Sequence, residues 1–197
     1  MTPKLRTLLG AVLLVVPLDQ ASKLLVGWRV HYGDRIPLVD GFLYLTHIRN
    51  PGAAFGVLAD AHPAARVAFF VGISLVAIVV ILSFFRRLAP GDRLSALALG
   101  MVLGGAIGNL TDRVLRGEVV DFLHVRLWGG RAWPDFNFAD ASIVVGVGLL
   151  VLELVASEGE TRAQGAASVG GAASPSGKAP SQAESTDGGD SPSRERG

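Results

Sequence analysis

Four stretches of about twenty apolar residues place the strongest constraint on this chain of 197 residues. A helix rises about 1.5 Å per residue, so roughly 20 apolar residues are needed to cross a hydrocarbon core of about 30 Å. Windows of that length lie at residues 5–26, 66–85, 94–115 and 139–156. Hydrophobic residues make up 50% of the sequence and charged residues only 18%, which is too apolar for an ordinary soluble domain. We therefore predict an all-α integral membrane protein with four transmembrane helices.

The composition also excludes several classes of function. A formal net charge of +1 provides no basic stripe of the kind that binds nucleic acid. The chain has no cysteine, so disulfides, thiolate metal sites and a cysteine nucleophile are excluded. Its four histidines never fall at the i, i+4 spacing of a helical zinc pair. We expect no nucleic-acid partner, no metal and no cofactor.

The flanking charges predict the orientation in the membrane. Lys4 and Arg6 flank the first window, and Arg86, Arg87 and Arg93 surround the short link between the second and third. Such residues mark the cytoplasmic side. The two longer loops then face outward, and they hold all three tryptophans and both tyrosines, as an interfacial aromatic belt would. No small-x-small cleavage site follows the first window, so we interpret it as an uncleaved helix.

Both outer loops contain β-prone sequence. Residues 35–39 and 42–47 flank Asp40-Gly41, a strong two-residue hairpin turn. Residues 122–128 and 131–133 flank Gly129-Gly130 in the same way. We predict a small extracytoplasmic β-cradle made by the two loops.

The composition changes after residue 156 to Ser, Gly, Ala, Pro and charged residues. Such a segment cannot bury a core. We predict a membrane domain over residues 1–156 and a disordered tail over residues 157–197, with both termini in the cytoplasm.

Polar residues gather at the outer end of the predicted bundle. Charge at membrane depth is costly unless it is paired or hydrated, so each such residue is a candidate for function. Snorkelling or a structural ion pair explains Lys23 or Arg113 alone equally well, but scattered snorkelling would use both membrane faces. The joint pattern favours a site. Its members are Asp19, Lys23, Asn109, Asp112, Arg113, Asp121, Asn137 and Asp140.

Asp121 and Asp140 come from two helix ends at the same depth, and they are the candidate catalytic pair. Two carboxylates in one partly dry site cannot both ionise easily, so the pair titrates as a unit. One carboxylate can then activate water while the protonated partner polarises a scissile carbonyl. The macrodipole of the fourth helix favours the charged form of Asp140. We therefore assign Asp140 as the base and Asp121 as the proton carrier.

Two neighbouring motifs have a structural as well as a functional interpretation. Asn137, three residues before Asp140, is typical of a helix N-cap with an acidic residue in the first turn. Asn50-Pro-Gly-Ala-Ala-Phe-Gly56 predicts either a tight turn before the second span or the lining of a cleft for an extended peptide. Gly104, Gly105 and Gly108 favour close helix packing.

Five motifs in this order resemble the lipoprotein signal peptidase family, also called signal peptidase II. They extend over nearly all of residues 1–156, and together they are highly specific. They are Asp19-Gln-Ala-Ser-Lys23, Asn50-Pro-Gly-Ala-Ala-Phe-Gly56, Gly108-Asn-Leu-Thr-Asp-Arg113, Val119-Val-Asp-Phe122 and Phe136-Asn-Phe-Ala-Asp140. Thr111, where a more apolar residue is common, and the tail depart from the family pattern.

The resemblance implies a bacterial inner-membrane aspartic endopeptidase that is inhibited by globomycin. We also expect the chain to be a monomer. Its substrates are diacylated prolipoproteins, reached from the membrane lipid, and it cuts the signal peptide just before the diacylglyceryl-modified cysteine. The resemblance also implies four helices, a β-cradle and a short helix over an active site at the outer face. Asp121 and Asp140 match the catalytic pair. The positions that match the supporting and substrate-binding residues are Asp19, Lys23, Asn50, Gly52, Asn109, Arg113, Asn137 and Ala139.

Three rival interpretations are weaker. Ser22 and Lys23 could form a Ser-Lys dyad, but adjacent helical residues point about 100° apart. A proton-coupled carrier would also place ionisable groups in the inner half of the bundle, and none is seen in mid-membrane there. A pure scaffold would leave polar residues clustered at one depth without an explanation.

Overall fold

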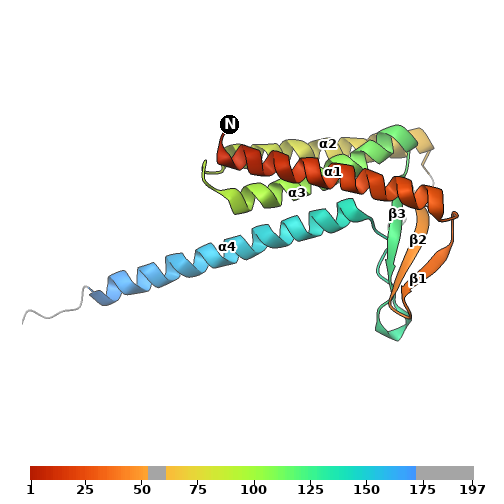
Figure 1. The fold of residues 1–197 in the computed structure, drawn as a ribbon. Helices are drawn as coiled ribbons and strands as arrows, with labels where there is room; N and C mark the ends of the chain where they lie inside the picture. The colour runs from red at the N-terminus through yellow and green to blue at the C-terminus, as the bar shows by residue number, and fades with distance from the viewer. Residues whose placement is uncertain (53–60, 172–197) are drawn as a thin grey trace, which may run out of the picture. The chain divides into compact units, whose positions relative to one another are not determined.

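A computed structural model describes residues 1–52 and 61–171 (Figure 1). The chain divides into two units, Met1–Glu158 and Gly159–Gly197. All the contacts below belong to the first unit.

Four helices confirm the predicted membrane architecture. They are α1 (Pro3–Arg29), α2 (Pro63–Arg87), α3 (Arg93–Arg116) and α4 (Phe138–Gly171), and each contains a segment long and apolar enough to cross a membrane. Local sequence sets the ends of α3. The Asp92 side chain accepts a hydrogen bond from Ser95 N at 3.1 Å, and Gly117 ends the helix in the left-handed conformation, with φ of +78°.

Small residues let the other helices approach α3 closely. A methyl group added at Gly104 would lie 2.8 Å from the Val15 Cβ of α1, and one at Gly105 would lie 2.4 Å from the Ala139 carbonyl oxygen of α4. The predicted role of these glycines in helix packing is confirmed. Because α3 has 56% of its membrane window buried, against 28% or less in the other helices, it is the centre of the bundle.

The β-cradle is a three-stranded antiparallel sheet at one end of the helices (Figure 1). Its strands are β1 (Arg35–Val39), β2 (Leu43–Asn50) and β3 (Val119–Val125), in the order β1-β2-β3. The predicted first hairpin is confirmed, and Gly41 in its turn has a φ of +75°. A cluster of Val26, Val30 and Phe122 packs the end of α1 against the sheet.

The predicted second hairpin is wrong in detail. Residues 131–133 form no strand, and the chain returns through a short 3-10 helix, η2 (Trp128–Gly130), and the isolated bridges Arg126↔Ala132 and Leu123↔Phe136. The positive φ angles of Gly129 and Gly130 allow the chain to reverse, but the returning arm pairs only at these isolated bridges, and Pro134 has no backbone N–H to donate. The loop therefore folds back on β3 without extending the sheet.

The last helix continues past the predicted end of the membrane domain. α4 ends at Gly171, so residues 157–171, assigned above to a disordered tail, are helical. They contain several Glu and Ala residues, which favour helix even where no core can form. The domain boundary itself remains a prediction, and residues 172–197 lie outside the described part of the chain. Residues 53–60 also lie outside it, so the rest of the Asn50-to-Gly56 motif and the expected short helix over the site are not tested.

Candidate active site

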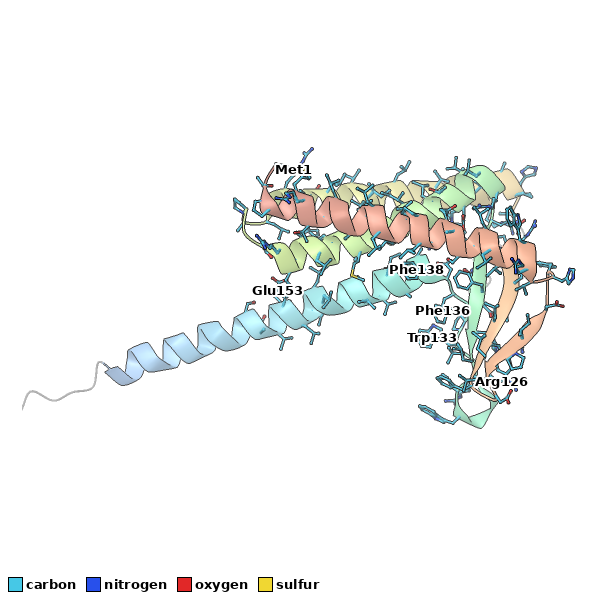
Figure 2. All side chains as sticks on the ribbon, in the orientation of Figure 1. Met1, Arg126, Trp133, Phe136, Phe138 and Glu153 are labelled. Atoms are coloured by element: carbon cyan, nitrogen blue, oxygen red, sulfur yellow. The ribbon has the colours of Figure 1, made fainter. Side chains whose placement is uncertain are left out.

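The candidate site forms where the sheet meets the ends of three helices. Asp121 lies in the middle of β3, a strand whose first four residues are all buried. Asp140 lies in the first turn of α4, and the side chains of Figure 2 fill the region between the sheet and the start of that helix, near Phe136 and Phe138. The two carboxyl groups thus come from different elements of secondary structure.

Two amides hold the Asp121 carboxyl group. Asn50 Nδ2 donates to Oδ2 at 2.9 Å, and Asn137 Nδ2 donates to Oδ1 at 2.7 Å. The β2–β3 register explains the first contact, because Ile48 pairs with Asp121 and Asn50, two residues further, points to the same face. Asp121 is only 2% exposed, so both of its oxygens depend on these neutral donors.

Asn137 also fixes Asp140. The Asp140 backbone N–H donates to Asn137 Oδ1 at 3.0 Å, and the Asn137 N–H donates to Asp140 Oδ2 at 3.2 Å. This is a reciprocal capping box at the start of α4. Asn109 Nδ2 donates to the other oxygen of Asp140 at 2.8 Å. Asn137 is therefore both the predicted N-cap and a bridge between the two candidate catalytic carboxyl groups.

An ion-paired cluster lies next to this amide-bridged pair. Lys23 Nζ donates to Asn109 Oδ1 at 2.9 Å and lies 2.8 Å from both Asp19 Oδ2 and Asp112 Oδ2. Arg116 makes a further ion pair with Asp112. All of these carboxylates are fully buried, and paired cations are what make buried carboxylates tolerable.

The ion-paired cluster also holds α4 in place. The Ala139 backbone N–H donates to Asp19 Oδ1 at 2.9 Å. Gln20 Nε2 lies 3.1 Å from Asp19 Oδ2 and from Asp112 Oδ1, so it links α1 to α3. A methyl group added at Gly108 would lie 2.5 Å from Asp19 Oδ2, and only glycine leaves room for this carboxylate.

Arg113 supplies positive charge beside the candidate catalytic pair. Its guanidinium interacts electrostatically with both Asp140 and Asp121, and Nη1 donates to the Asn109 carbonyl at 3.1 Å. The guanidinium carbon lies 5.4 Å from the ring centroid of Phe70 on α2, a cation–π contact.

The Phe70 ring in turn limits the turn after β2. Gly52 has a φ of +91°, and a methyl group added to it would lie 2.2 Å from Phe70 Cε2. The Gly52 N–H donates to Asn50 Oδ1 at 2.8 Å, which orients the Asn50 amide toward Asp121.

Burial raises the pKa of Asp121 to about 7. The hydrogen bond from Asn50 opposes that shift, and the negative charge of Asp140 adds to it. At neutral pH this carboxyl group therefore carries a proton for a large share of the time. A proton held there supports the assignment of Asp121 as the proton carrier.

The structure brings all the predicted site residues into one hydrogen-bonded and packed region, although their roles remain proposals. It adds Gln20, Asp112, Arg116 and Phe70, of which only Asp112 was recognised as part of the polar cluster. The proposed Ser22–Lys23 dyad is not formed. Ser22 Oγ donates to the Asp19 carbonyl at 2.8 Å, while Lys23 bonds to Asp19, Asn109 and Asp112. Within the described residues, no group of three His, Asp or Glu side chains could hold a metal.

Four membrane-length helices with one buried and one half-buried carboxyl group at one end fit a membrane-embedded peptidase of the aspartic type. The sequence model of signal peptidase (SPase) II matches residues 11–156, which is most of the chain. The chain belongs to the signal peptidase II family.

Curated relatives and solved structures agree with this family. The lipoprotein signal peptidase of Geobacter sulfurreducens is 44% identical over 158 residues, which cover 80% of this chain and 97% of that protein. The lipoprotein signal peptidase of Moorella thermoacetica is 41% identical over 148 residues, which cover 75% of this chain and 92% of that protein. A solved structure described as a bacterial membrane enzyme, obtained in meso at 2.3 Å resolution, is 33% identical with a TM-score of 0.68, and covers 77% of this chain and 89% of that one.

Proposed function

We propose that this protein is the membrane-embedded aspartic endopeptidase that removes signal peptides from bacterial prolipoproteins. The proposed cleavage site lies just before the diacylglyceryl-modified cysteine. The observation that carries the proposal is the position of Asn137, whose side chain bonds to Asp121 and caps the helix turn that holds Asp140. One amide thus supports two carboxyl groups, and the relatives at 41–47% identity are named as lipoprotein signal peptidases.

In the proposed mechanism, Asp140 acts as the base and Asp121 as the acid. The Asp140 carboxylate takes a proton from a water molecule, whose oxygen then forms a bond to the scissile carbonyl carbon. The Asp121 proton is donated to the carbonyl oxygen, giving a neutral diol. Collapse of this intermediate breaks the C–N bond: one hydroxyl of the diol returns its proton to the Asp121 carboxylate as the carbonyl re-forms, and the proton held by Asp140 moves to the departing amine nitrogen.

The surrounding residues have separate proposed roles. Asn50 and Gly52 lie at the end of β2, where an extended peptide could bind beside Asp121. Arg113 offsets the negative charge of the pair, and its remaining N–H groups can donate to a peptide carbonyl. Asp19, Lys23, Asn109, Asn137 and Ala139 shape the site, because their contacts fix the end of α1 against the start of α4.

We further propose that the chain is a monomer in the bacterial inner membrane, with both termini in the cytoplasm and the site at the outer face. Figure 2 supports this orientation, because Met1 and Glu153 lie at the opposite end of the helices from Arg126 and Trp133 in the cradle region. The predicted cytoplasmic basic residues flank that first end. A diacylated cysteine is anchored in the bilayer at headgroup level, so the substrate would enter laterally from lipid.

The proposal is tested by incubating the purified protein with a diacylated prolipoprotein and following signal-peptide release. Asp121→Asn and Asp140→Asn should each lower the rate by at least about 10³-fold, because each removes a reacting group. Asp40→Asn is the matched control, since it makes the same chemical change in an exposed turn and should leave the rate unchanged. Near-full activity in either site variant would refute the two-aspartate mechanism.

Replacing Ser22 with Ala discriminates against the dyad interpretation. Its hydroxyl contacts only a carbonyl of its own helix, so Ser22→Ala should retain most of the activity. Loss of activity in a folded Ser22→Ala protein would instead favour serine chemistry.

A further inference from the structure

A cavity lies on the opposite face of the sheet from the Asp121 carboxyl group. It has a volume of about 430 Å³, within the range of small-molecule sites. Arg49 of β2 and Val120 of β3 line it, and these two residues pair in the sheet register. Asp121 pairs with Ile48 instead, and successive strand residues face opposite sides, so this cavity and Asp121 lie on different faces.

Two opposite charges in this cavity have no side-chain partner in residues 1–52 and 61–171. Arg49 and Glu118 both line it, and neither makes a hydrogen bond or ion pair through its side chain among the described residues. They also do not pair with one another. A third charge, that of Lys23, is already matched by its neighbouring carboxylates. The cavity therefore presents one free cation and one free anion, held apart, within the described part of the chain.

Arg116 strengthens the cationic side of the cavity. Its Nη1 atom contacts Asp112 and Gln20, while its Nε and Nη2 groups make no described hydrogen bond. Together with Arg49 it offers several N–H donors from two planar guanidinium groups. That geometry suits a phosphate group, whose oxygens accept two parallel N–H bonds from one arginine.

His47 of β2 also lines the cavity, and its Nδ1 atom lies 2.9 Å from the Val30 carbonyl oxygen. A further wall of the cavity is apolar and belongs to α1. Leu24, Gly27 and Trp28 line it, and Leu24 and Trp28 are 52% and 84% exposed. These residues lie at the end of a membrane-length helix, where a tryptophan marks the boundary between lipid and water. One side of the cavity thus faces lipid, while its charges lie at headgroup level.

We propose that this cavity binds the headgroup of a zwitterionic phospholipid that carries a primary ammonium group, such as phosphatidylethanolamine. The phosphate contacts Arg49 and Arg116, and the ammonium group donates to Glu118. The acyl chains extend along Leu24 of α1. A zwitterion satisfies both unpaired charges at once, whereas an anionic headgroup leaves Glu118 without a partner. A free zwitterion of the same chemistry, phosphoethanolamine, lacks the acyl chains.

Quenching of Trp28 fluorescence by brominated lipids tests this proposal without any assay of peptidase activity. The full chain, with Trp128→Phe and Trp133→Phe, is placed in phosphatidylcholine vesicles containing a small fraction of brominated phosphatidylethanolamine, phosphatidylcholine or phosphatidylglycerol. Salt at about 0.3 M screens diffuse attraction to the membrane surface. We expect brominated phosphatidylethanolamine to quench Trp28 fluorescence at about tenfold lower mole fraction than the other two lipids. It alone makes charge-assisted hydrogen bonds through both its phosphate and its ammonium group.

Three variants localise the effect. Arg49→Gln should remove the preferential quenching by phosphatidylethanolamine, because it weakens the contact with the phosphate. Glu118→Gln should make phosphatidylethanolamine and phosphatidylcholine quench Trp28 equally. Arg35→Gln is the matched control, because Arg35 is an exposed arginine on β1 outside the cavity, and it should keep the preference. Equal quenching by all three lipids, or an unchanged preference in Arg49→Gln, would overturn the proposal. Competition by millimolar phosphoethanolamine that abolishes the preference would show a soluble ligand and overturn the lipid assignment.

Discussion

The amide-bridged pair of Asp121 and Asp140 contrasts with the ion-paired cluster of Asp19, Lys23, Asp112 and Arg116. Both groups contain two carboxyl groups, and Asn109 contacts both. In the ion-paired cluster, cations lie 2.8 Å from carboxylate oxygens and cancel their charge. In the amide-bridged pair, neutral asparagine donors occupy those positions.

Aspartate therefore has two settings in one small volume, one suited to linking helices and one suited to acid–base catalysis. A buried carboxylate with a cation partner has its charge balanced by that partner, which suits a structural link between helices. A carboxyl group with only amide partners keeps access to both protonation states. Acid–base catalysis needs that second behaviour. The predictions below test whether the two groups separate in this way.

Removing the cation should have the largest effect, and it should act on stability. Lys23→Met leaves the carboxylates of Asp19 and Asp112 buried without Lys23. Breaking a buried pair by removing one partner costs roughly 3–5 kcal/mol. We expect a large fall in the apparent unfolding temperature in detergent, followed by circular dichroism. Adding Asp112→Asn to Lys23→Met should restore part of the lost unfolding temperature. An unchanged unfolding temperature in Lys23→Met would show that the ion-paired cluster is not structural.

Substitutions at Asn137 should separate helix capping from site geometry. Asn137→Ala removes both functions, whereas Asn137→Ser keeps a good N-cap but loses the donor to Asp121. We expect the rate of signal-peptide release to fall roughly 10- to 100-fold in both variants, since a hydrogen bond to a charged group contributes about 1.5–3 kcal/mol. Only Asn137→Ala should also lose stability, by about 1 kcal/mol. Full activity in Asn137→Ser would reduce Asn137 to a helix cap.

The raised pKa of Asp121 predicts a pH dependence that the wild type shows and Asp121→Asn lacks. Activity should decline above pH 7, by about tenfold per pH unit, because Asp121 loses the proton that it donates. Stability should follow the same direction. The folded carboxyl group keeps its proton between the ordinary pKa near 4 and the raised value of about 7, so its contribution is present below pH 4 and is lost as pH rises through 7.

Asp121→Asn has no titrating group at this position and should lack this stability trend. Thermal unfolding of both proteins from pH 4 to pH 9 measures the difference. Parallel curves for the two proteins would remove the basis for the proposed proton position.

A smaller effect is expected where the site meets α2. Gly52→Ala combines a strained positive φ with a clash against the Phe70 ring, so the ring that contacts Arg113 must move. We expect a loss of activity of about tenfold. Gly129→Ala is the matched control, because it has a similar φ of +71° but nothing within 4 Å of the added methyl group. Equal activity in the two variants would mean that Phe70 does not position the site.

The sequence predicted the elements whose signals are local. Hydropathy located all four helices, and Asp40-Gly41 located the first hairpin, because span length and turn chemistry are properties of short segments. The second hairpin was wrong in detail because Trp128–Gly130 form a 3-10 helix and the returning arm meets β3 only at isolated bridges, which a count of β-prone residues does not reveal.

The family motifs named the residues of the candidate site, whose roles stay predictions, but the contacts between these residues and their partners could not be predicted. Gln20 bonds to Asp112, 92 positions away, and Phe70 reaches Arg113 from a different helix. Contacts of this kind depend on how helices pack, and no periodicity in the sequence encodes them. The division between an amide-bridged pair and an ion-paired cluster therefore appeared only with the fold.

The position of the proton in the proposed catalytic pair decides which carboxyl group is the acid and which is the base. Infrared difference spectroscopy of protein labelled with ¹³C at the aspartate carboxyl groups, with Asp121→Asn and Asp140→Asn used for assignment, would titrate each group in the intact protein. We predict that Asp121 loses its proton near pH 7, as the group of higher pKa. A pKa near 4 for Asp121, with Asp140 as the group of higher pKa, would contradict the account and reverse the roles of acid and base.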